Sequence, residues 1–271
     1  MENTTMPVVF ITGASSGIGH ACAKALSSKG YRVYGTSRTP TGADWGFRLL
    51  QMDVGDEESV ASAVRQILDE TGCIDIVVNN AGMGYGGAVE DTSLAEAKDT
   101  IETNFFGVLR VCKAVLPAMR AQGAGRIINV SSIAGMIGCP FVSLYSASKY
   151  AMEGMTDALR MEVTPYGIKV ILINPGDIAT GFTKNRRLCQ EAGYTSAYSD
   201  QFQRTLAIIE KNEIQGSSPD MVAKVLLKAV SSQSPKRRYI AGTLVERVAV
   251  MLRRWLPEGV FSWAVSKYYG M

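Results

Sequence analysis

Histidine is the scarcest reactive residue in this sequence, and its scarcity argues against several kinds of active site. The 271 residues include one histidine, His20, which follows a glycine-rich turn where an ordinary helix residue is expected. A Ser-His-Asp triad or a histidine-based metal cluster therefore has little support. The five cysteines are irregularly spaced and none forms a Cys-x-x-Cys pair. We expect free thiols, no disulfides and no metal site.

Membrane-spanning and targeting signals are also lacking. No uncharged apolar run reaches the roughly 18 residues that a membrane-spanning helix needs, and residues 1–7 have neither the basic nor the apolar region of a signal peptide. The formal net charge is only +3, which is too small to indicate a nucleic-acid partner. We expect a cytoplasmic protein. No repeat or long linker divides the chain into several domains.

Short apolar runs alternate with helical patterns along most of the chain. Between the runs, apolar residues recur every three or four positions, as in 94–122 and 144–165. This alternation predicts βαβ units with right-handed crossovers. We predict a single α/β Rossmann domain, a doubly wound parallel sheet of about seven strands with helices on both faces and the site beyond the carboxyl ends of the strands. The expected strands are 8–12, 31–36, 47–52, 74–79, 126–130, 169–173 and 238–241.

A glycine-rich turn stands between the first expected strand and the first expected helix. Glycines in such a turn let the backbone approach a pyrophosphate, and the helix N-terminus adds N–H groups and positive potential. The strand before the turn and the helix after it are the context that this motif requires. The turn predicts dinucleotide binding by Gly13, Ser15, Ser16, Gly17, Ile18 and Gly19.

The end of the second strand bears on the choice of dinucleotide. NAD sites usually place an acid there to hold the ribose 2′-hydroxyl, whereas an arginine accommodates a 2′-phosphate. This chain has Ser37 and Arg38 with no adjacent acid. The Arg38 guanidinium can form a bidentate pair with phosphate, although a solvated loop arginine is the simpler alternative. We favour NADP(H) over NAD(H).

Tyr145 and Lys149 form the second strong pattern. In a helix, the two residues lie one turn apart on the same face. An ammonium beside a phenol favours the phenolate, so it lowers a pKa that is about 10 in a free tyrosine. Such a pair could donate and accept a proton near neutral pH. A Tyr-Lys pair on a helix surface is the common alternative.

Taken together, these motifs resemble the short-chain dehydrogenase/reductase family. The resemblance covers residues 6–242, and 176–218 with the tail are most similar to 17β-hydroxysteroid dehydrogenase-like and retinol dehydrogenase-like members. We divide the single domain 1–271 into a dinucleotide-binding core with the catalytic residues (6–175), a substrate loop or lid (176–218) and a C-terminal amphipathic tail (243–271). The matching motifs are Thr12-Gly-Ala-Ser-Ser-Gly-Ile-Gly19, Asn79-Asn-Ala-Gly82, Asn104, Ser132, Tyr145-x-x-x-Lys149 and Pro175-Gly176.

The resemblance implies a catalytic role for four residues. Tyr145 is the acid/base, and Lys149 lowers the Tyr145 pKa and holds the nicotinamide ribose. Ser132 hydrogen-bonds the substrate oxygen. Asn104 holds a water molecule that connects Lys149 to solvent for proton relay.

The resemblance also implies the remaining cofactor contacts. Asp53 and Val54 occupy the position that contacts adenine. Ser16 stands where some NADP-preferring members carry a basic residue, so Arg38 would act alone and dual cofactor use stays open. The other implied contacts are Asn80, Ala81, Gly82, Pro175, Gly176, Ile178 and Thr180.

The long stretch 176–218 bears on the substrate. It exceeds an ordinary connection and predicts a lid over the site, with aromatic residues that include Phe182 and Tyr194. We expect Cys139, Phe141 and Phe182 to line the substrate side together with Ser132 and Tyr145. The expected reaction interconverts a ketone and a secondary alcohol on an apolar substrate: a steroid, a retinoid or an acyl-chain ketone. A 3-ketosphinganine or 3-oxoacyl reductase is the alternative enzyme, and a catalytically silent dinucleotide-binding sensor is the alternative from another class.

The tail 243–271 combines aromatic residues such as Trp255 with basic residues such as Arg254. An amphipathic helix of this kind can lie on a membrane surface. It can equally cap the pocket or pack in an oligomer interface, and we favour packing over peripheral membrane contact. The family resemblance implies a homodimer or homotetramer formed through the long helices 94–122 and 144–165.

Overall fold

Seven parallel strands form the central sheet, in the order β3-β2-β1-β4-β6-β7-β9. The computed structural model describes residues 6–40, 45–193 and 195–271. The predicted doubly wound α/β fold is confirmed, and each expected strand is present within a few residues. The strands are β1 Val8–Ile11, β2 Arg32–Ser37, β3 Arg48–Gln51, β4 Ile76–Asn79, β6 Gly125–Val130, β7 Ile168–Pro175 and β9 Arg238–Ala241.

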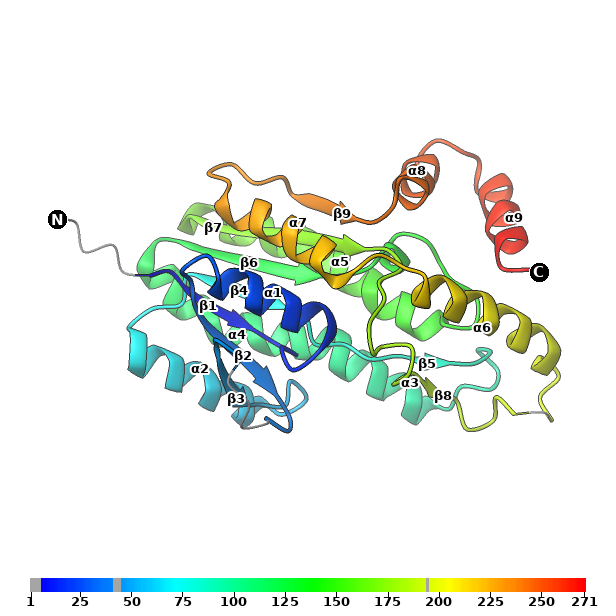
Figure 1. Cartoon of the computed structure of the whole chain (residues 1–271), viewed down its shortest axis with the longest axis horizontal. Coiled ribbons are helices and arrows are strands. Elements are labelled where there is room, and N and C mark those ends of the chain that lie inside the picture. The colour runs from blue at the N-terminus through cyan, green and yellow to red at the C-terminus, as the bar shows by residue number, and fades with distance from the viewer. Residues whose placement is uncertain (1–5, 41–44, 194) are drawn as a thin grey trace.

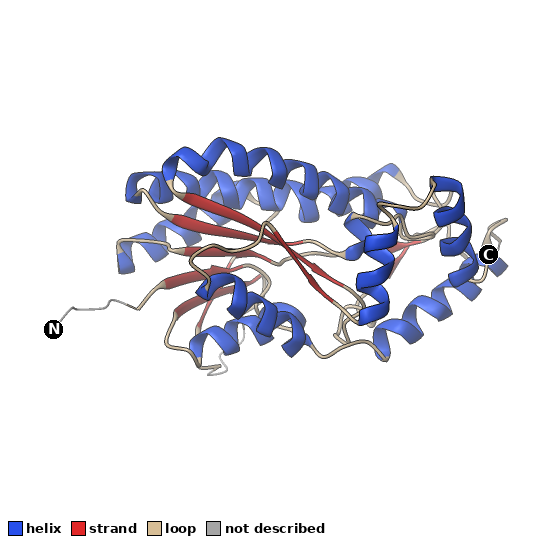
Figure 2. Ribbon diagram, turned by 90° about the horizontal axis from the view of Figure 1, so that it is seen from above, coloured by secondary structure: helices blue, strands red, loops and turns tan. Residues whose placement is uncertain are grey.

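Helices cover both faces of this sheet (Figures 1 and 2). Strands that are buried on both faces read as continuous apolar runs, and all four residues of β1 and of β4 are buried. Alternate side chains point to opposite faces: Phe10 and Val77 pack with α2, α4 and α5, whereas Ile11 and Val78 pack with α1 and α7. These helices are α1 Gly17–Ser27, α2 Glu57–Thr71, α4 Gly107–Gln122, α5 Ser143–Val163 and α7 Pro219–Ser231.

The strand order reverses between β1 and β4. From β1 the chain runs outward through β2 to β3, and then returns to place β4 on the other side of β1. Two neighbouring crossovers therefore leave in opposite directions, which opens a crevice at the carboxyl ends of β1 and β4. The glycine-rich turn follows β1 and the Asn80-Ala81-Gly82 segment follows β4, so the topology brings two of the predicted cofactor-binding segments together.

The expected helical segment 94–122 is interrupted. It consists of α3 (Leu94–Ile101), a π-helical turn (Glu102–Phe106) and α4. A π turn inserts one extra residue into the helix and often marks a functional site. Here it contains Asn104, whose side chain is buried.

The stretch 176–218, the predicted lid, contains regular structure. It includes the helix α6 (Ser199–Ile214) and the short strand β8 (Arg187–Leu188), which pairs in parallel with β5 (Tyr85–Gly86). The tail forms two helices, α8 (Leu244–Leu252) and α9 (Glu258–Tyr268). The end of the tail is fastened to α6, because Asn212 donates to the Tyr268 hydroxyl at 2.8 Å and Thr205 donates to the Tyr269 carbonyl at 3.2 Å.

Figure 1 shows α6, α8 and α9 at the end of the molecule where the C-terminus lies, away from the N-terminus. Within the described residues, no helix combines the length and the apolar character needed to cross a membrane.

Candidate active site

A cavity of about 730 Å³ lies beyond the carboxyl ends of the central strands. Its volume is within the usual range for a small-molecule or cofactor site. Gly19, Asn104 and Phe141 do not line it, but every other residue predicted for the site does. These lining residues are Gly13, Ser15, Ser16, Gly17, Ile18, Ser37, Arg38, Asp53, Val54, Asn80, Ala81, Gly82, Ser132, Cys139, Tyr145, Lys149, Pro175, Gly176, Ile178, Thr180 and Phe182.

The glycine-rich turn has the geometry of a phosphate cradle. Gly13 and Gly17 have φ values of +65° and +54°, which L-residues with a side chain rarely adopt. Because α1 begins at Gly17, its unpaired N–H groups and positive dipole end are at the cavity wall. Arg38 and Ser37 line the same cavity from the end of β2. The residues present therefore fit a nicotinamide dinucleotide.

Gly19 contributes to the turn by packing. A Cβ atom at this position would clash with the carbonyl oxygen of Gly13 and the side-chain nitrogen of Asn80. The Asn80 side chain donates to the carbonyl oxygens of Thr12 and Gly13, each at 3.0 Å. The tight approach of α1 to the end of β4 thus excludes any side chain at residue 19.

Thr12 is a residue that the sequence-based site assignment missed. Its hydroxyl accepts hydrogen bonds from the backbone N–H groups of Asn80 and Ala81, at 2.9 and 3.0 Å. Thr12 thereby ties the glycine-rich turn to the segment after β4. Its place directly before Gly13, at the end of an apolar strand, was the available signal.

Tyr145 and Lys149 both lie in α5, one turn apart, as predicted. The Lys149 side chain is almost fully buried, with 3% exposed, and its Nζ donates to the carbonyl oxygen of Val130 at 3.0 Å. Nζ lies 5.6 Å from the centroid of the Tyr145 ring. Ser132 caps the short helical turn after β6 and lines the cavity with them.

Burial sets the ionisation of this pair. It raises the pKa of Tyr145 to about 12, against the opposing effect of the neighbouring Ser132 hydroxyl. Burial also lowers the pKa of Lys149 to about 8, opposed by the charge of Glu153. The sequence-based expectation of a lowered Tyr145 pKa is therefore wrong for the structure described. Desolvation of the phenolate outweighs any attraction to an ammonium that is itself buried and hydrogen-bonded elsewhere.

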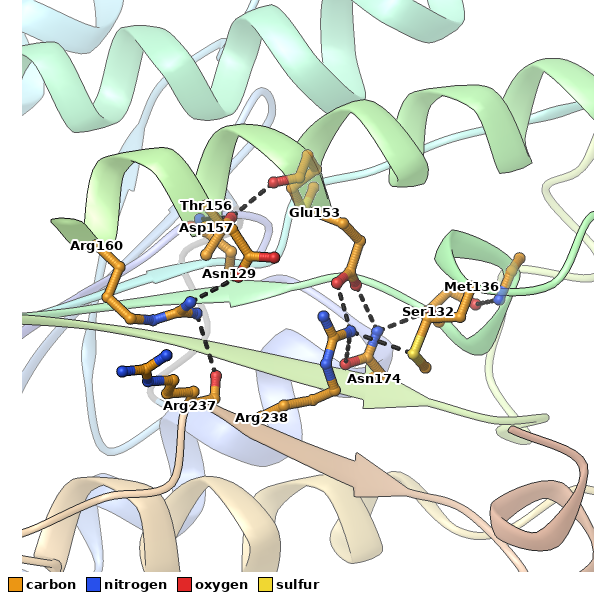
Figure 3. A network of polar contacts seen from close by, with 12 residues as sticks. Asn129, Ser132, Met136, Glu153, Thr156, Asp157, Arg160, Asn174, Arg237 and Arg238 are labelled. Atoms are coloured by element: carbon orange, nitrogen blue, oxygen red, sulfur yellow. Dashed lines mark hydrogen bonds and ion pairs between the residues drawn. The ribbon is translucent and has the colours of Figure 1, made fainter. Parts of the chain in front are cut away.

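A buried polar network connects strands β7 and β9 to helix α5 and to the backbone of Ser132 (Figure 3). Asn174, in β7, donates to the Ser132 carbonyl oxygen at 2.9 Å and to Glu153 at 2.6 Å. Arg238, in β9, forms an ion pair with Glu153 and donates to the Asn174 side-chain oxygen at 3.2 Å. None of these three residues was predicted for the site from the sequence. Asn174 within an apolar strand, and Glu153 one helical turn after Lys149, were the available signals.

The structure places Asn104 behind the cavity. Its side-chain oxygen accepts from the Met83 N–H at 2.9 Å, and its nitrogen donates to the Met83 carbonyl at 2.8 Å and to the Ser148 hydroxyl at 2.9 Å. Both amide hydrogens are therefore committed to protein groups. Asn104 thus connects the segment after β4 to α5. Its role in a water relay stays a prediction.

Phe141 also lies away from the cavity. It is buried with a φ of +60°, and its ring packs 5.4 Å from that of Phe202 in α6. Phe141 thus holds the 176–218 stretch against the body of the protein. Phe182 lies on the cavity side, with its ring 5.8 Å from that of Tyr145. Tyr194 falls outside the described residues.

Charged side chains from the 176–218 stretch line part of the cavity. Arg186 and Glu213 form an ion pair there, with 4% and 15% of their side chains exposed. Glu213 also accepts a hydrogen bond from the Thr183 hydroxyl at 2.7 Å. Asp177 lines the same cavity, and burial, followed by the charges of Glu246 and Glu213, raises its pKa to about 6. These residues were not predicted from the sequence, because no local pattern marks residues 177, 186 and 213 as neighbours.

Comparison with known proteins identifies the family. The family model for "short chain dehydrogenase" matches residues 7–191. A 3-ketodihydrosphingosine reductase from Bacteroides thetaiotaomicron is 45% identical over 264 residues, which is 97% of this chain and 98% of the relative. A dehydrogenase/reductase SDR family member 7B from Xenopus tropicalis is 34% identical over 96% of this chain and 85% of the relative.

A solved structure of similar fold supports the same assignment. The short-chain dehydrogenase from Streptomyces avermitilis superposes with a TM-score of 0.78, at 31% identity, over 93% of this chain and 96% of that chain. The chain belongs to the short-chain dehydrogenase/reductase family, the oxidoreductases that act on CH–OH groups with a nicotinamide dinucleotide.

Proposed function

We propose that this protein is an NADP(H)-dependent reductase of long-chain 3-ketones, with 3-ketodihydrosphingosine as the leading substrate. The observation that carries the proposal is the 45% identity, over nearly the full length of both chains, with a 3-ketodihydrosphingosine reductase. This substrate was the alternative in the sequence analysis. It now has more support than a steroid or a retinoid, since the cavity wall contains charged groups beside its apolar ones.

In the proposed reaction, Tyr145 gives its hydroxyl proton to the carbonyl oxygen while Ser132 donates a hydrogen bond to the same oxygen. Bound NADPH supplies the hydride that reduces the carbonyl carbon. A donor aimed at the developing alkoxide stabilises charge in the transition state. The raised pKa of Tyr145 keeps the phenol protonated at neutral pH, as a proton donor requires. Solvent then returns a proton to Tyr145, and Lys149 and Asn104 are the proposed route.

The choice of NADP(H) rests on Arg38. It lines the cavity at the end of β2, next to Ser37, and no acid adjoins it in the sequence. A guanidinium there can pair with a 2′-phosphate, whereas a ribose 2′-hydroxyl is usually held by an acid. We propose that the residues lining the cavity from the glycine-rich turn to Thr180 hold the dinucleotide, and that residues 176–218 act as the substrate lid.

We also propose that the protein is cytoplasmic and forms homodimers or homotetramers, with the tail in peripheral contact with membranes. Exposed apolar side chains on the tail support this contact: Trp255 and Trp263 are 81% and 63% exposed, and Arg254, which adjoins Trp255 in the sequence, is also exposed. Aromatic and basic residues together favour the interface of an anionic bilayer. Sedimentation with anionic vesicles, for the wild type and for a Trp255→Glu/Trp263→Glu double variant, tests this contact, and light scattering gives the oligomeric state.

A panel of carbonyl compounds tests the proposed reaction. The purified protein is mixed with NADPH or NADH and with 3-ketodihydrosphingosine, a 3-oxoacyl thioester, a ketosteroid or retinal, and absorbance at 340 nm is followed. We expect the largest kcat/KM with NADPH and 3-ketodihydrosphingosine. A larger value with the steroid or retinal would overturn the substrate assignment. Binding of NADPH without turnover of any ketone would favour the silent sensor.

A further inference from the structure

Asp177 lines the catalytic cavity with no hydrogen-bonding or ion-pairing partner for its carboxylate among the described residues, although the charge of nearby Arg186 acts on it. It follows Pro175-Gly176 at the end of β7. Its main chain is fixed on both sides, since its N–H donates to Glu246 at 2.6 Å and its carbonyl accepts from the Ser217 N–H at 3.0 Å. Within residues 6–40, 45–193 and 195–271, its side chain has no hydrogen bond and no ion pair. The backbone is thus held while the carboxylate stays available to a ligand.

The two neighbouring acids already have partners. Glu213 is paired with Arg186 and accepts from Thr183. Glu246 accepts from the N–H groups of Asp177 and Thr243, both at 2.6 Å. Of these three neighbouring carboxylates, of which Asp177 and Glu213 line the cavity, Asp177 alone lacks a donor among the described residues.

The ion-paired residues Arg186 and Glu213 lie close enough to the Tyr145 hydroxyl to affect its pKa. The charges of Glu213 and Arg186 both act on the pKa of Tyr145, in opposite directions. Arg186 and Glu213 neutralise each other, so Asp177 leaves this wall with net negative charge. A partly buried carboxylate without a partner is unfavourable, and a ligand cation would relieve that cost. The wall favours a cation over an anion, because Asp177 adds a negative charge to the Arg186–Glu213 pair.

We propose that Asp177 receives the ammonium group of a substrate that carries an amine beside its reacting ketone. The enzyme would then select amino ketones over otherwise identical ketones. This inference rests on the proposed ketone reduction and adds the residue that recognises the amine of the substrate. The ammonium would form a charge-assisted hydrogen bond with the carboxylate, while Phe182 and Ile209, which line the same cavity, offer apolar surface to the remainder of the molecule.

A pair of ketones that differ only in the amine provides the test. 3-Ketodihydrosphingosine is 2-amino-1-hydroxyoctadecan-3-one, and 1-hydroxyoctadecan-3-one lacks only its amine. We expect the wild type to prefer the amino ketone. In Asp177→Asn, kcat/KM for the amino ketone should fall about 10- to 100-fold, the range for losing a hydrogen bond to a charged group. The value for the amine-free ketone should stay within about twofold, and Asp177→Glu should restore part of the preference.

Asp99→Asn is the matched control. Asp99 lines the same cavity, but it already accepts hydrogen bonds from the Tyr85 hydroxyl at 3.0 Å and from Arg187 at 2.8 Å. Its substitution should leave the preference for the amine unchanged.

The outcomes separate this inference from the proposed function. Equal kcat/KM for the two ketones in the wild type would overturn the ammonium site while leaving the reductase intact. An equal loss for both ketones in Asp177→Asn would overturn it as well, because Asp177 would then act on the shared machinery. Failure of the wild type to reduce either ketone would instead contradict the proposed function. The thermal unfolding midpoint of each variant verifies that it is folded.

Discussion

The ammonium group of Lys149 is bonded to the carbonyl oxygen of Val130, at 3.0 Å, and not to the Tyr145 hydroxyl. Val130 is the last residue of β6, so this contact fastens α5 to the carboxyl end of the sheet. Lys149 is thereby held at a fixed position beside the cavity, 5.6 Å from the centroid of the Tyr145 ring. Tyr145 can act as a neutral proton donor in this arrangement, because nothing in its surroundings forces the phenol to ionise.

Removal of the Tyr145 hydroxyl should abolish most turnover. We expect Tyr145→Phe to lower kcat about 10²- to 10⁴-fold, the usual cost of losing a general acid. The ring remains in the substitution, so its contact with Phe182 and the affinity for NADPH should be preserved. Stopped-flow or absorbance kinetics measure the first effect, and NADPH fluorescence titration measures the second. Unchanged turnover in the variant would contradict the assigned role.

Substitution of Arg38 should change the cofactor preference. If its guanidinium holds the 2′-phosphate, Arg38→Ala should raise the Kd for NADPH about 10- to 100-fold, the range for losing hydrogen bonds to a charged group. The Kd for NADH, which lacks the phosphate, should be nearly unchanged. Isothermal titration calorimetry measures both values, and Arg65→Ala is the control because Arg65 is an exposed arginine paired with Glu58. A parallel loss for both dinucleotides would argue against 2′-phosphate recognition.

A methyl group at residue 19 should disrupt the glycine-rich turn. Gly19→Ala places a Cβ against the Gly13 carbonyl oxygen and the Asn80 side-chain nitrogen. We therefore expect overpacking to lower the free energy of unfolding by about 1–3 kcal/mol. Gly154→Ala is the matched control, since a Cβ there meets nothing within 4 Å in the middle of α5. It should be neutral or stabilising by about 0.5–1 kcal/mol. Urea unfolding compares the two, and equal stability would refute the clash.

The charge on Asp177 should make the folded protein less stable. Its pKa is raised from 3.8 to about 6, so the unfolded chain ionises first and stability falls as the pH rises from about 4 to 6. Asp177→Asn removes this cost. We expect the variant to unfold at a temperature about 2–4 °C higher than the wild type at pH 7.5, with a smaller gain at pH 4.5.

Calorimetry at the two pH values tests this stability prediction. A lower unfolding temperature for Asp177→Asn at pH 7.5 would contradict it. The charged and titratable groups that interact with Asp177 are Glu246, Glu213, Arg186, Cys139, Tyr268 and Tyr269.

The sequence predicted the sheet well because parallel strands, buried on both faces, leave continuous apolar runs. It also predicted most residues of the cavity, since the glycine-rich turn and the Tyr145–Lys149 pair are local patterns. The pairing of Tyr85 with Arg187, which joins β5 to β8, had no such signal. Two residues in each strand are too few for any periodicity to appear.

Other features depended on contacts between distant segments. The raised pKa of Tyr145 follows from burial by the folded chain, whereas the sequence showed only the neighbouring lysine. The charged cavity wall joins residues from the end of β7, from the segment before β8 and from α6. Asn104 was recognised by its motif, but its bonds to Met83 and Ser148 require the π turn, which periodicity did not reveal.

The contacts among Ser132, Asn174, Glu153 and Arg238 have a consequence for biosynthesis. Arg238 belongs to β9, the last strand of the sheet to be translated. A growing chain that ends before residue 238 leaves the Glu153 carboxylate without its ion-pair partner, and an unpaired buried charge is strongly destabilising. We expect the nascent polypeptide to remain inactive on the ribosome until β9 emerges and pairs with β7. The dinucleotide-binding turn is synthesised more than 200 residues earlier.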